Sequence, residues 1–473
     1  MGAAMMQSER ARQSSTTGAA RKRTLIVGLG STGLSAARYL ARLGEHVLVI
    51  DSRAHPPCLD ALRAERPEIR IELETLDPKW LASASRVVWS PGLDAAMPLA
   101  AEARRRGIEL VGDIELFARA ARAPVIAVTG SNGKSTVTTL TARMLEAAGF
   151  AALAGGNLGP PALDLLDGPS EVGTEPPDAY VLEISSFQME TTDSLRPLAA
   201  AVLNVSADHL DRHGDLDRYA ALKAKLLAAA DHAVFNRDDP LVRSVGERCT
   251  RPVPFSTAAA LDRGYSIVET NGVRHLGRDG KPLVPVGELS LRGLHNEANA
   301  LAALALTATF LDSVGAPADV LDAAIEALTH FEGLPHRCRP VAVRGGVEYI
   351  DDSKGTNVGA TVAALGGLPG PLVLIAGGLG KSADFAPLAR AAQGKVKAAV
   401  LIGAAARDIE AALAGVCPTR RAADLPAAVH AAAGLASPGD TVLLSPACAS
   451  QDMFRDYKHR GEVFAAAVRE LPQ

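Results

Sequence analysis

The stretch over residues 125–136 constrains the fold of this chain more than any other. A β-branched apolar run leads there into a glycine-bracketed loop that ends in Lys134-Ser135-Thr136. A strand, loop and helix of this kind direct backbone N–H groups at an anion, and the lysine and hydroxyl can then bind phosphate and Mg²⁺. The usual motif has a further glycine where Val128 stands. The stretch therefore predicts a nucleotide phosphate site before a helix over residues 138–148, with an ordinary glycine-rich turn as the alternative.

Length and composition narrow the class of protein. A chain of 473 residues, 48% hydrophobic and 22% charged, is expected to form two to four globular, soluble domains. Its net charge of −4 and 4% aromatic content give no reason to expect nucleic acid or an anionic membrane as partner. The five cysteines form no C-x-x-C pair, which favours reduced thiols in the cytoplasm. We expect no membrane insertion, and we expect residues 1–22 to be a disordered tail rather than a secretory signal.

The first part of the chain carries a dinucleotide-binding pattern. A strand over residues 24–27 runs into Gly28, Gly30 and Gly33, and a second strand over residues 47–50 ends in Asp51. This βαβ pattern alone would predict NAD, and the alternative is a doubly wound domain whose glycines serve only turn and packing. A strand leading to Ser90 and a last strand at 108–111 indicate that this domain closes near residue 112.

Candidate metal and substrate ligands follow the phosphate loop. Glu183 stands near the end of a strand predicted over residues 179–184, where a carboxylate could hold Mg²⁺ beside a triphosphate. Asn157, in a loop predicted over 155–159, could contact substrate. His209 has an aspartate on either side just past a strand at 200–205, and it is either a metal ligand or part of a cap cluster. Lys223 and Lys225 lie on a helix predicted over 219–230, and pattern alone places both on a solvated face.

The last third repeats an α/β pattern. Residues 253–291 predict antiparallel strands without a helix, residues 294 onward a long helix, and residues 331–337 a linker. A second open sheet is then predicted, with strands at 347–350, 372–376, 398–402 and 441–445. Polar groups at such strand ends mark a ligand site. Residues 377–382 repeat the G-x-x-G-K-S spacing, and either a phosphate loop or a carboxylate cradle satisfies it.

Segments at 129–136, 183–188, 204–211, 295–299, 334–337 and 352–357 occur in one order that closely resembles the Mur ligase family. The resemblance extends over residues 23–465. It implies an α/β protein of three-domain architecture: after the tail, a Rossmann-like UDP-substrate domain at 23–112, a central P-loop ATP domain at 113–333 and a glutamate-binding domain at 334–473.

Two further segments narrow the implied activity. Residues 378–385 and 445–450 are similar to those of family members that add D-glutamate to UDP-N-acetylmuramoyl-L-alanine, and no Asp-Asn-Pro-Arg motif of the diaminopimelate-adding members is present. The resemblance implies an ATP-dependent acid–amino-acid ligase that works through an acyl phosphate in cytoplasmic peptidoglycan precursor synthesis. We expect a monomer with small-molecule substrates.

The resemblance also assigns roles to individual residues. ATP phosphates would contact Gly130, Ser131, Asn132, Gly133, Lys134, Ser135 and Thr136. Adenine would face Asn296 and Asn299, and the ribose and phosphates would face Arg337, Asp352 and Lys354. Two Mg²⁺ ions are implied, one held by Ser135 and Glu183 and the other by His209 and a carbamylated Lys223. The resemblance thus replaces the solvated-face interpretation of Lys223, while that of Lys225 is kept. The implied catalytic residues are Lys134, Glu183, His209 and Lys223.

The implied substrate residues fall into two groups. UDP, rather than NAD, would bind at Ser31, Thr32, Asp51, Ser52, Arg53 and Ser90. The other substrate contacts would come from Asn157, His209, Thr356, Lys381, Ser450 and Tyr457. Two residues depart from the family pattern. Gln451 stands where the family commonly has an apolar or aromatic residue, and Tyr457 stands where it usually has Phe. The rival hypotheses are a nicotinamide oxidoreductase and a non-catalytic P-loop module.

Overall fold

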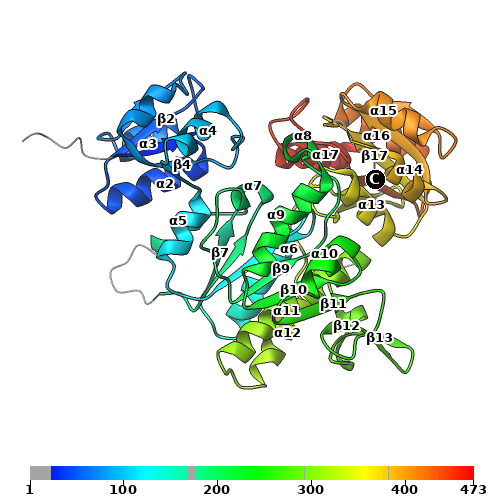
Figure 1. Ribbon diagram of the computed structural model, residues 1–473. Coiled ribbons are helices and arrows are strands. Elements are labelled where there is room, and N and C mark those ends of the chain that lie inside the picture. The colour runs from blue at the N-terminus through cyan, green and yellow to red at the C-terminus, as the bar shows by residue number, and fades with distance from the viewer. Residues whose placement is uncertain (1–22, 168–175, 292, 382, 473) are drawn as a thin grey trace, which may run out of the picture. The chain divides into compact units, whose positions relative to one another are not determined.

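The computed structural model describes residues 23–167, 176–291, 293–381 and 383–472, and its strands form three sheets (Figure 1). The predicted tail at 1–22 and Ser382 lie outside the described residues. The chain divides into two compact units. The first draws on Met1–Ala121, Gly159–Thr174 and Phe187–Leu195, and the second on Arg122–Leu158, Glu175–Ser186 and Arg196–Gln473.

The first sheet is parallel, with strand order β3-β2-β1-β4-β5. Its strands are β1 (Arg23–Val27), β2 (Val47–Ile50), β3 (Arg70–Glu72), β4 (Ala84–Trp89) and β5 (Glu109–Val111). Leu25, Val27 and Trp89 alternate with residues of the opposite face and are buried beside helix α4. The helices of this unit are α2 (Ser31–Arg42), α3 (Leu59–Glu65), α4 (Pro98–Arg105), α5 (Asp113–Ala120) and α7 (Ser186–Met189, most of which belongs here), with 3₁₀ turns η1 (Pro78–Ser83) and η2 (Ala162–Asp167).

The second sheet has nine strands in the order β14-β13-β12-β11-β10-β9-β6-β8-β7. They are β6 (Val125–Thr129), β7 (Ala152–Gly156), β8 (Ala179–Glu183), β9 (Ala199–Val202), β10 (His232–Asn236), β11 (Pro252–Ser256), β12 (Tyr265–Thr270), β13 (Val273–Arg278) and β14 (Lys281–Pro285). Strands β12, β13 and β14 pair antiparallel, which confirms the predicted antiparallel segment, whereas β11 pairs parallel with β10 and continues the main sheet.

Helices cover both faces of this sheet, because its strands alternate buried side chains between the two sides. Val234 faces the core that includes helices α6 and α11, whereas Ala233 and Phe235 face α9 and α10. The helices of this region are α6 (Lys134–Ala147), α8 (Leu210–His213), α9 (Leu216–Ala228), α10 (Pro240–Gly246), α11 (Leu294–Ser313) and α12 (Val320–Thr329), with the 3₁₀ turn η3 (Val286–Glu288).

The third sheet has the strand order β15-β16-β20-β17-β18-β19, and every pair except β15–β16 is parallel. Its strands are β15 (Arg339–Arg344), β16 (Val347–Asp351), β17 (Leu372–Gly377), β18 (Val396–Ile402), β19 (Thr419–Arg421) and β20 (Thr441–Leu444). Leu374 and Leu443 pack on the side of α13 to α15, while Ile375 and Leu444 pack on the side of α16 and α17. These helices are α13 (Val358–Gly367), α14 (Ala386–Ala392), α15 (Ala406–Leu413), α16 (Leu425–Leu435) and α17 (Tyr457–Glu470).

The predicted α/β class is confirmed, but several predicted bounds were wrong. Helix α6 begins at Lys134 rather than at residue 138, because Gly133 adopts the left-handed conformation and ends the loop. Gly155 and Gly156, predicted as loop, are the end of strand β7. The domain bounds at 112 and 333 stay a prediction, since the compact units place residues 187–195 with the first sheet. Within the described residues, every helix is too short or too polar to span a membrane.

Candidate nucleotide and substrate sites

The loop between β6 and α6 has the backbone that a phosphate cradle needs. Gly130 and Gly133 have φ angles of +154° and +85°, which side-chain-bearing residues rarely adopt. A Cβ on Gly133 would also lie 2.4 Å from Asn299 Oδ1. Both glycines are therefore required by the local geometry, and the loop lies at the N-terminus of α6, where unpaired N–H groups favour an anion.

Two lysines share one carbonyl of this loop. Lys134 Nζ donates to Gly130 O and Ser131 O, and Lys223 Nζ donates to Gly130 O, each at 2.9 Å. Burial lowers the pKa of Lys134, and it lowers the pKa of Lys223 well below its ordinary value, with Lys134 lowering it further. The site thus holds amines that can lose a proton more readily than exposed lysines do.

Lys223 is 1% exposed, so its placement on a solvated face from pattern alone was wrong. Its Nζ lies 4.3 Å from the centroid of the Tyr219 ring, one turn earlier on helix α9. The Tyr219 hydroxyl accepts a hydrogen bond from Ser131 Oγ at 3.2 Å, which ties the ring to the phosphate loop. Only part of the Lys225 side chain is covered. Two lysines on one helix therefore have different environments.

Glu183 lies where β8 ends, beside the phosphate loop, because β8 pairs parallel with β6. Asn157 Nδ2 donates to Glu183 Oε1 at 2.6 Å, and Asn157 N donates to Glu183 O at 2.8 Å. Burial raises the pKa of Glu183, but the charges of Lys134 and Arg337, together with the hydrogen bonds that the carboxylate accepts, outweigh this effect, and the pKa lies below its ordinary value. The carboxylate is therefore ionised and held in place by Asn157.

The oxygen donors here fit a Mg²⁺ ion on one side of the loop. Glu183 Oε2 is buried and has no hydrogen-bond partner in the described part of the chain, and Ser135 supplies a hydroxyl nearby. A hard dication prefers such oxygen ligands. Among the described residues there is no group of three or more His, Cys, Asp and Glu side chains suited to a metal. As an amine, Lys223 offers no oxygen to a second ion, so its role as a metal ligand, which depends on carbamylation, stays a prediction.

His209 directly precedes helix α8 as its N-cap and adopts the left-handed conformation, with φ of 55°. Its Nε2 lies 3.6 Å from Asp208 Oδ2. Burial lowers the pKa of His209, and Asp208 partly offsets this effect. A neutral imidazole can be a metal ligand, so His209 has suitable chemistry, while the choice between a metal ligand and a cap cluster stays a prediction.

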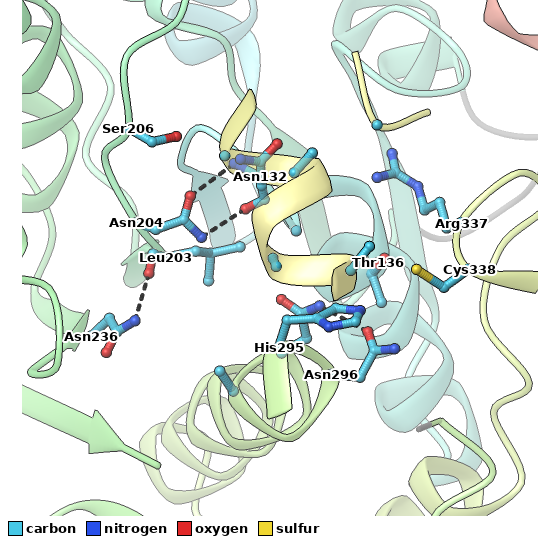
Figure 2. A pocket seen from close by; sticks show the side chains of 18 of the residues that line it. Asn132, Thr136, Leu203, Asn204, Ser206, Asn236, His295, Asn296, Arg337 and Cys338 are labelled. Carbon is cyan, nitrogen blue, oxygen red and sulfur yellow. Dashed lines mark hydrogen bonds between the residues drawn. The ribbon is translucent and has the colours of Figure 1, made fainter. Parts of the chain in front are cut away.

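A cavity of about 340 Å³ adjoins the loop (Figure 2). It is lined on one side by the loop and α11, and on the other by the start of the third sheet and helix α13. Asn296 and Asn299 both line it, and Asn299 Nδ2 donates to Asn296 Oδ1 at 3.1 Å. His295 lines it too, against Gly367, where a Cβ would come within 2.9 Å of His295 Nδ1. The two predicted adenine-facing asparagines therefore lie in one cavity with the loop.

Sequence reasoning did not assign several residues that shape this cavity: Asn204, Asn236, Asp239 and His295. Asn204 Oδ1 accepts from Asn132 N at 2.8 Å, and Asn204 Nδ2 donates to Asn132 O at 3.1 Å, so the segment just after β9 holds the phosphate loop (Figure 2). Asn236 Nδ2 donates to Leu203 O at 3.0 Å. Their location in the sequence could have marked three of them as cavity residues, since Asn204, Asn236 and Asp239 each follow or end a strand of the parallel sheet.

Arg337, Asp352 and Lys354 reach the cavity from the third sheet. Arg337 Nη2 donates to Ser135 Oγ at 2.6 Å. Burial raises the pKa of Asp352 to about 7, although a hydrogen bond from Ser445 Oγ at 2.7 Å opposes the shift. Burial, with Arg337 and Lys134, lowers the pKa of Lys354 to about 8. These predicted nucleotide ligands are thus placed together around the phosphate loop.

The predicted amino-acid ligands follow three neighbouring strands. Thr356, Ser450 and Lys381 come after the carboxyl ends of β16, β20 and β17, which lie side by side in the sheet. Leu379 and Ala449 exchange two backbone hydrogen bonds of 2.9 Å and 3.1 Å, so the loops of Lys381 and Ser450 are joined. Lys381 is exposed and Ser450 is buried.

Tyr457 belongs to the same edge of the third sheet. The Lys354 Nζ atom lies 4.0 Å from the centroid of the Tyr457 ring, within the range of a cation–π contact. The ring thereby connects a predicted nucleotide ligand with a predicted amino-acid ligand. Gln451, the other departure from the family pattern, is exposed.

In the first compact unit, the predicted UDP ligands also gather at one sheet edge. Ser31 and Thr32 begin α2, whereas Asp51 to Arg53 follow β2 and Ser90 follows β4, and these strands flank β1. Asp51 accepts hydrogen bonds from Leu29 N at 2.7 Å and from Arg53 N at 2.8 Å. Burial raises the pKa of Asp51, but hydrogen bonds from Arg53 lower it. The net result is a pKa below the ordinary value of an aspartate. Asp51 therefore fixes the glycine turn and orients Arg53, and a direct substrate contact stays a prediction.

The phosphate loop, its buried lysines and the adjoining cavity define a nucleotide-binding protein of the P-loop class. Three family models match the chain in succession: the Mur ligase MurD-like N-terminal domain at 22–112, the Mur ligase middle domain at 128–307 and the Mur ligase glutamate ligase domain at 336–448. The chain belongs to the Mur ligase family.

Relatives match over nearly the whole length. A UDP-N-acetylmuramoylalanine--D-glutamate ligase of Nitrosococcus oceani is 47% identical, covering 95% of this chain and 96% of its own. Proteins of the same name from Methylobacillus flagellatus and Pseudomonas aeruginosa are 48% and 46% identical, covering 95% and 94% of this chain and 97% and 98% of their own.

Solved structures share the fold. A UDP-N-acetylmuramate-alanine ligase of Thermotoga maritima has a TM-score of 0.59 at 19% identity, covering 94% of this chain and 99% of its own. A MurF ligase of the same organism, in complex with ADP, has a TM-score of 0.58 at 17% identity, covering 95% and 99%. At these identities the likeness concerns the fold alone.

Proposed function

We propose that this chain is an ATP-dependent ligase that joins D-glutamate to UDP-N-acetylmuramoyl-L-alanine in cytoplasmic peptidoglycan precursor synthesis. The observation that carries the proposal is the 46–48% identity, over nearly the full length, to relatives named for this activity. The geometry agrees with it, since a phosphate loop, a nucleotide-sized cavity and a polar strand edge adjoin one another in the second compact unit.

The chemistry proceeds in two displacements. A carboxylate is a poor electrophile, so an oxygen of the alanyl carboxylate first attacks the γ-phosphorus of ATP, and the P–O bond breaks with its electron pair leaving on ADP. The glutamate amine then attacks the carbonyl carbon of the acyl phosphate, phosphate leaves with the C–O electron pair, and the amine gives up a proton. Lys134, Arg337 and Lys354 are the cations that would offset charge on the phosphate oxygens in the first step.

Two Mg²⁺ ions belong to the proposal. Ser135 and Glu183 would hold one, and His209 with a carbamylated Lys223 would hold the other. The modification joins the neutral Lys223 amine to CO₂, releases one proton and converts a cation into an anion, which suits a buried amine of lowered pKa. The ions would supply charge neutralisation at the phosphate oxygens.

The substrates would bind at the two sheet edges. UDP would contact Ser31, Thr32, Asp51, Ser52, Arg53 and Ser90. Asn157 would contact the muramoyl-alanine, while Thr356, Lys381, Ser450 and Tyr457 would surround glutamate. Lys381 is suited to one glutamate carboxylate because its ammonium is exposed at the end of β17. We further propose that the enzyme acts as a monomer.

A reconstituted assay tests the function. We expect ADP and an amide product only when ATP, Mg²⁺, UDP-N-acetylmuramoyl-L-alanine and D-glutamate are all present, with L-glutamate and D-aspartate as parallel amino acids. Product with another amino acid but none with D-glutamate would overturn the substrate assignment. Saturable quenching of NADH fluorescence, with no ADP formed under any condition, would instead favour an oxidoreductase.

A further inference from the structure

Asn357 connects helix α13 of the third sheet with two loops of the second sheet. It is 8% exposed and caps α13, since its Oδ1 accepts from Ala360 N at 2.8 Å. Its Nδ2 donates to Asn132 Oδ1 at 3.1 Å and to Asp208 Oδ2 at 2.9 Å, and Asn132 Nδ2 donates back to Asn357 Oδ1 at 3.3 Å. One amide therefore bonds to its own helix, to the phosphate loop and to the segment that carries His209.

A glycine two residues after Asn357, in the first turn of α13, indicates that the close approach is built into the sequence. A Cβ at Gly359 would lie 2.7 Å from Ser206 Oγ and 3.4 Å from Asn132 Nδ2. With glycine here, the first turn of α13 lies this near the phosphate loop without displacing the Ser206 side chain. The helix then runs along the nucleotide cavity, from Asn132 at one end to His295 at the other (Figure 2).

We infer that Asn357 is a positioning residue that fixes the start of α13 against the phosphate loop and Asp208. This contact keeps the cavity wall and the loop from Lys354 to Thr356 in place relative to the bound phosphates. This inference rests on the proposed function for its catalytic consequence. Gly359 and Ala360 line the cavity two and three residues beyond Asn357, and Lys354 lies just before it. A displaced helix start would therefore move cavity-lining residues on both sides of Asn357 at once.

The amide can be separated from the helix cap by substitution. Asn357→Asp keeps a good N-cap, because an aspartate oxygen accepts from Ala360 N as well as an asparagine oxygen does. It removes both donated hydrogen bonds and places a carboxylate beside Asp208. The reciprocal pair Asn357→Asp with Asp208→Asn restores a donor and an acceptor with their positions exchanged.

The first readout is the ratio of ADP to amide product in the complete reaction with the full chain. We expect Asn357→Asp to raise this ratio, because a site whose walls are displaced exposes the acyl phosphate to water. We also expect the KM for ATP to rise roughly ten-fold, because the hydrogen bonds that hold the cavity wall are lost. The reciprocal pair is expected to recover most of both losses. Asp424→Asn is the matched control, since Asp424 caps α16 by accepting from Ala427 N at 2.8 Å and should change neither value.

The second readout does not depend on ligase activity. Titration with a fluorescent ATP analogue should show the same order of affinity: wild type, then the reciprocal pair, then Asn357→Asp. If wild type made no amide, the proposed function would fail while this titration still tested the contact. Affinity and coupling unchanged in Asn357→Asp, or a reciprocal pair no better than the single variant, would overturn the inference.

Discussion

Asp352 is a carboxyl group whose burial gives the protein a specific pH dependence. Its folded pKa is about 7, while an aspartate in an unfolded chain ionises near about 4. Between these values the folded protein binds more protons than the unfolded chain, so Asp352 makes the free energy of unfolding fall as the pH rises towards 7. At a pH above both pKa values the full loss of stability is present, and at a pH below both it is absent.

Asp352→Asn should remove this penalty. We expect the free energy of unfolding of the variant, relative to wild type, to increase by roughly 2–3 kcal/mol from pH 5 to pH 8, because each pKa unit is worth about 1.4 kcal/mol. Urea unfolding at the two pH values measures the difference. A variant whose stability follows the pH in parallel with wild type would show that Asp352 ionises normally in the folded protein.

Lys223 and Lys225 provide a matched pair of substitutions on one helix. Lys223→Ala removes the amine that donates to Gly130 O, and we expect ligation to fall at least a hundred-fold because the carbamylated group would be lost. Lys225→Ala should leave the rate within about two-fold of wild type, since its side chain is only partly covered. Initial rates with and without added bicarbonate provide the comparison. Full activity of Lys223→Ala in bicarbonate-free buffer would contradict the assignment.

Helix α13 offers two glycines with opposite surroundings. A Cβ at Gly359 meets Ser206, whereas a Cβ at Gly366 meets no atom within 4 Å. Gly366→Ala should raise the free energy of unfolding by about 0.5–1 kcal/mol through helix propensity and leave nucleotide affinity unchanged. Gly359→Ala should weaken nucleotide binding about five-fold, because the added methyl group must displace either the Ser206 side chain or the start of the helix. Equal affinities of the two variants for an ATP analogue would contradict the close approach.

The elements that could be predicted from sequence are those with a continuous apolar run or a glycine-bracketed turn. Strands β2 and β6 and the start of α11 follow this rule. Strand β7 was missed because Gly155 and Gly156 resemble a turn, yet Gly156 lies against Glu183 O, where a Cβ would come within 2.4 Å. Asn357 was missed as a contact because its partners are far away in the sequence and no local pattern marks them. Pairings of this kind become visible only when the sheets are assembled.

The division into two compact units predicts how the entire chain should respond to ligands. We expect two calorimetric transitions, with UDP alone raising the one that belongs to the first unit and an ATP analogue alone raising the other. A ligand at about a hundred times its Kd adds roughly 2.7 kcal/mol to the stability of the part that binds it. A single transition that both ligands raise equally would show that the units unfold together.

Glu183 depends on its neighbouring strand for both its backbone and its side chain. Gly156 leaves room for Glu183 O, and Asn157 donates to Glu183 O and Glu183 Oε1. A substitution at either position therefore displaces a carboxylate that is 26 residues away from Asn157 in the sequence. Among related sequences, the residues at positions 156, 157 and 183 should accordingly vary together. A substitution at one of them should be tolerated only where the other two have also changed.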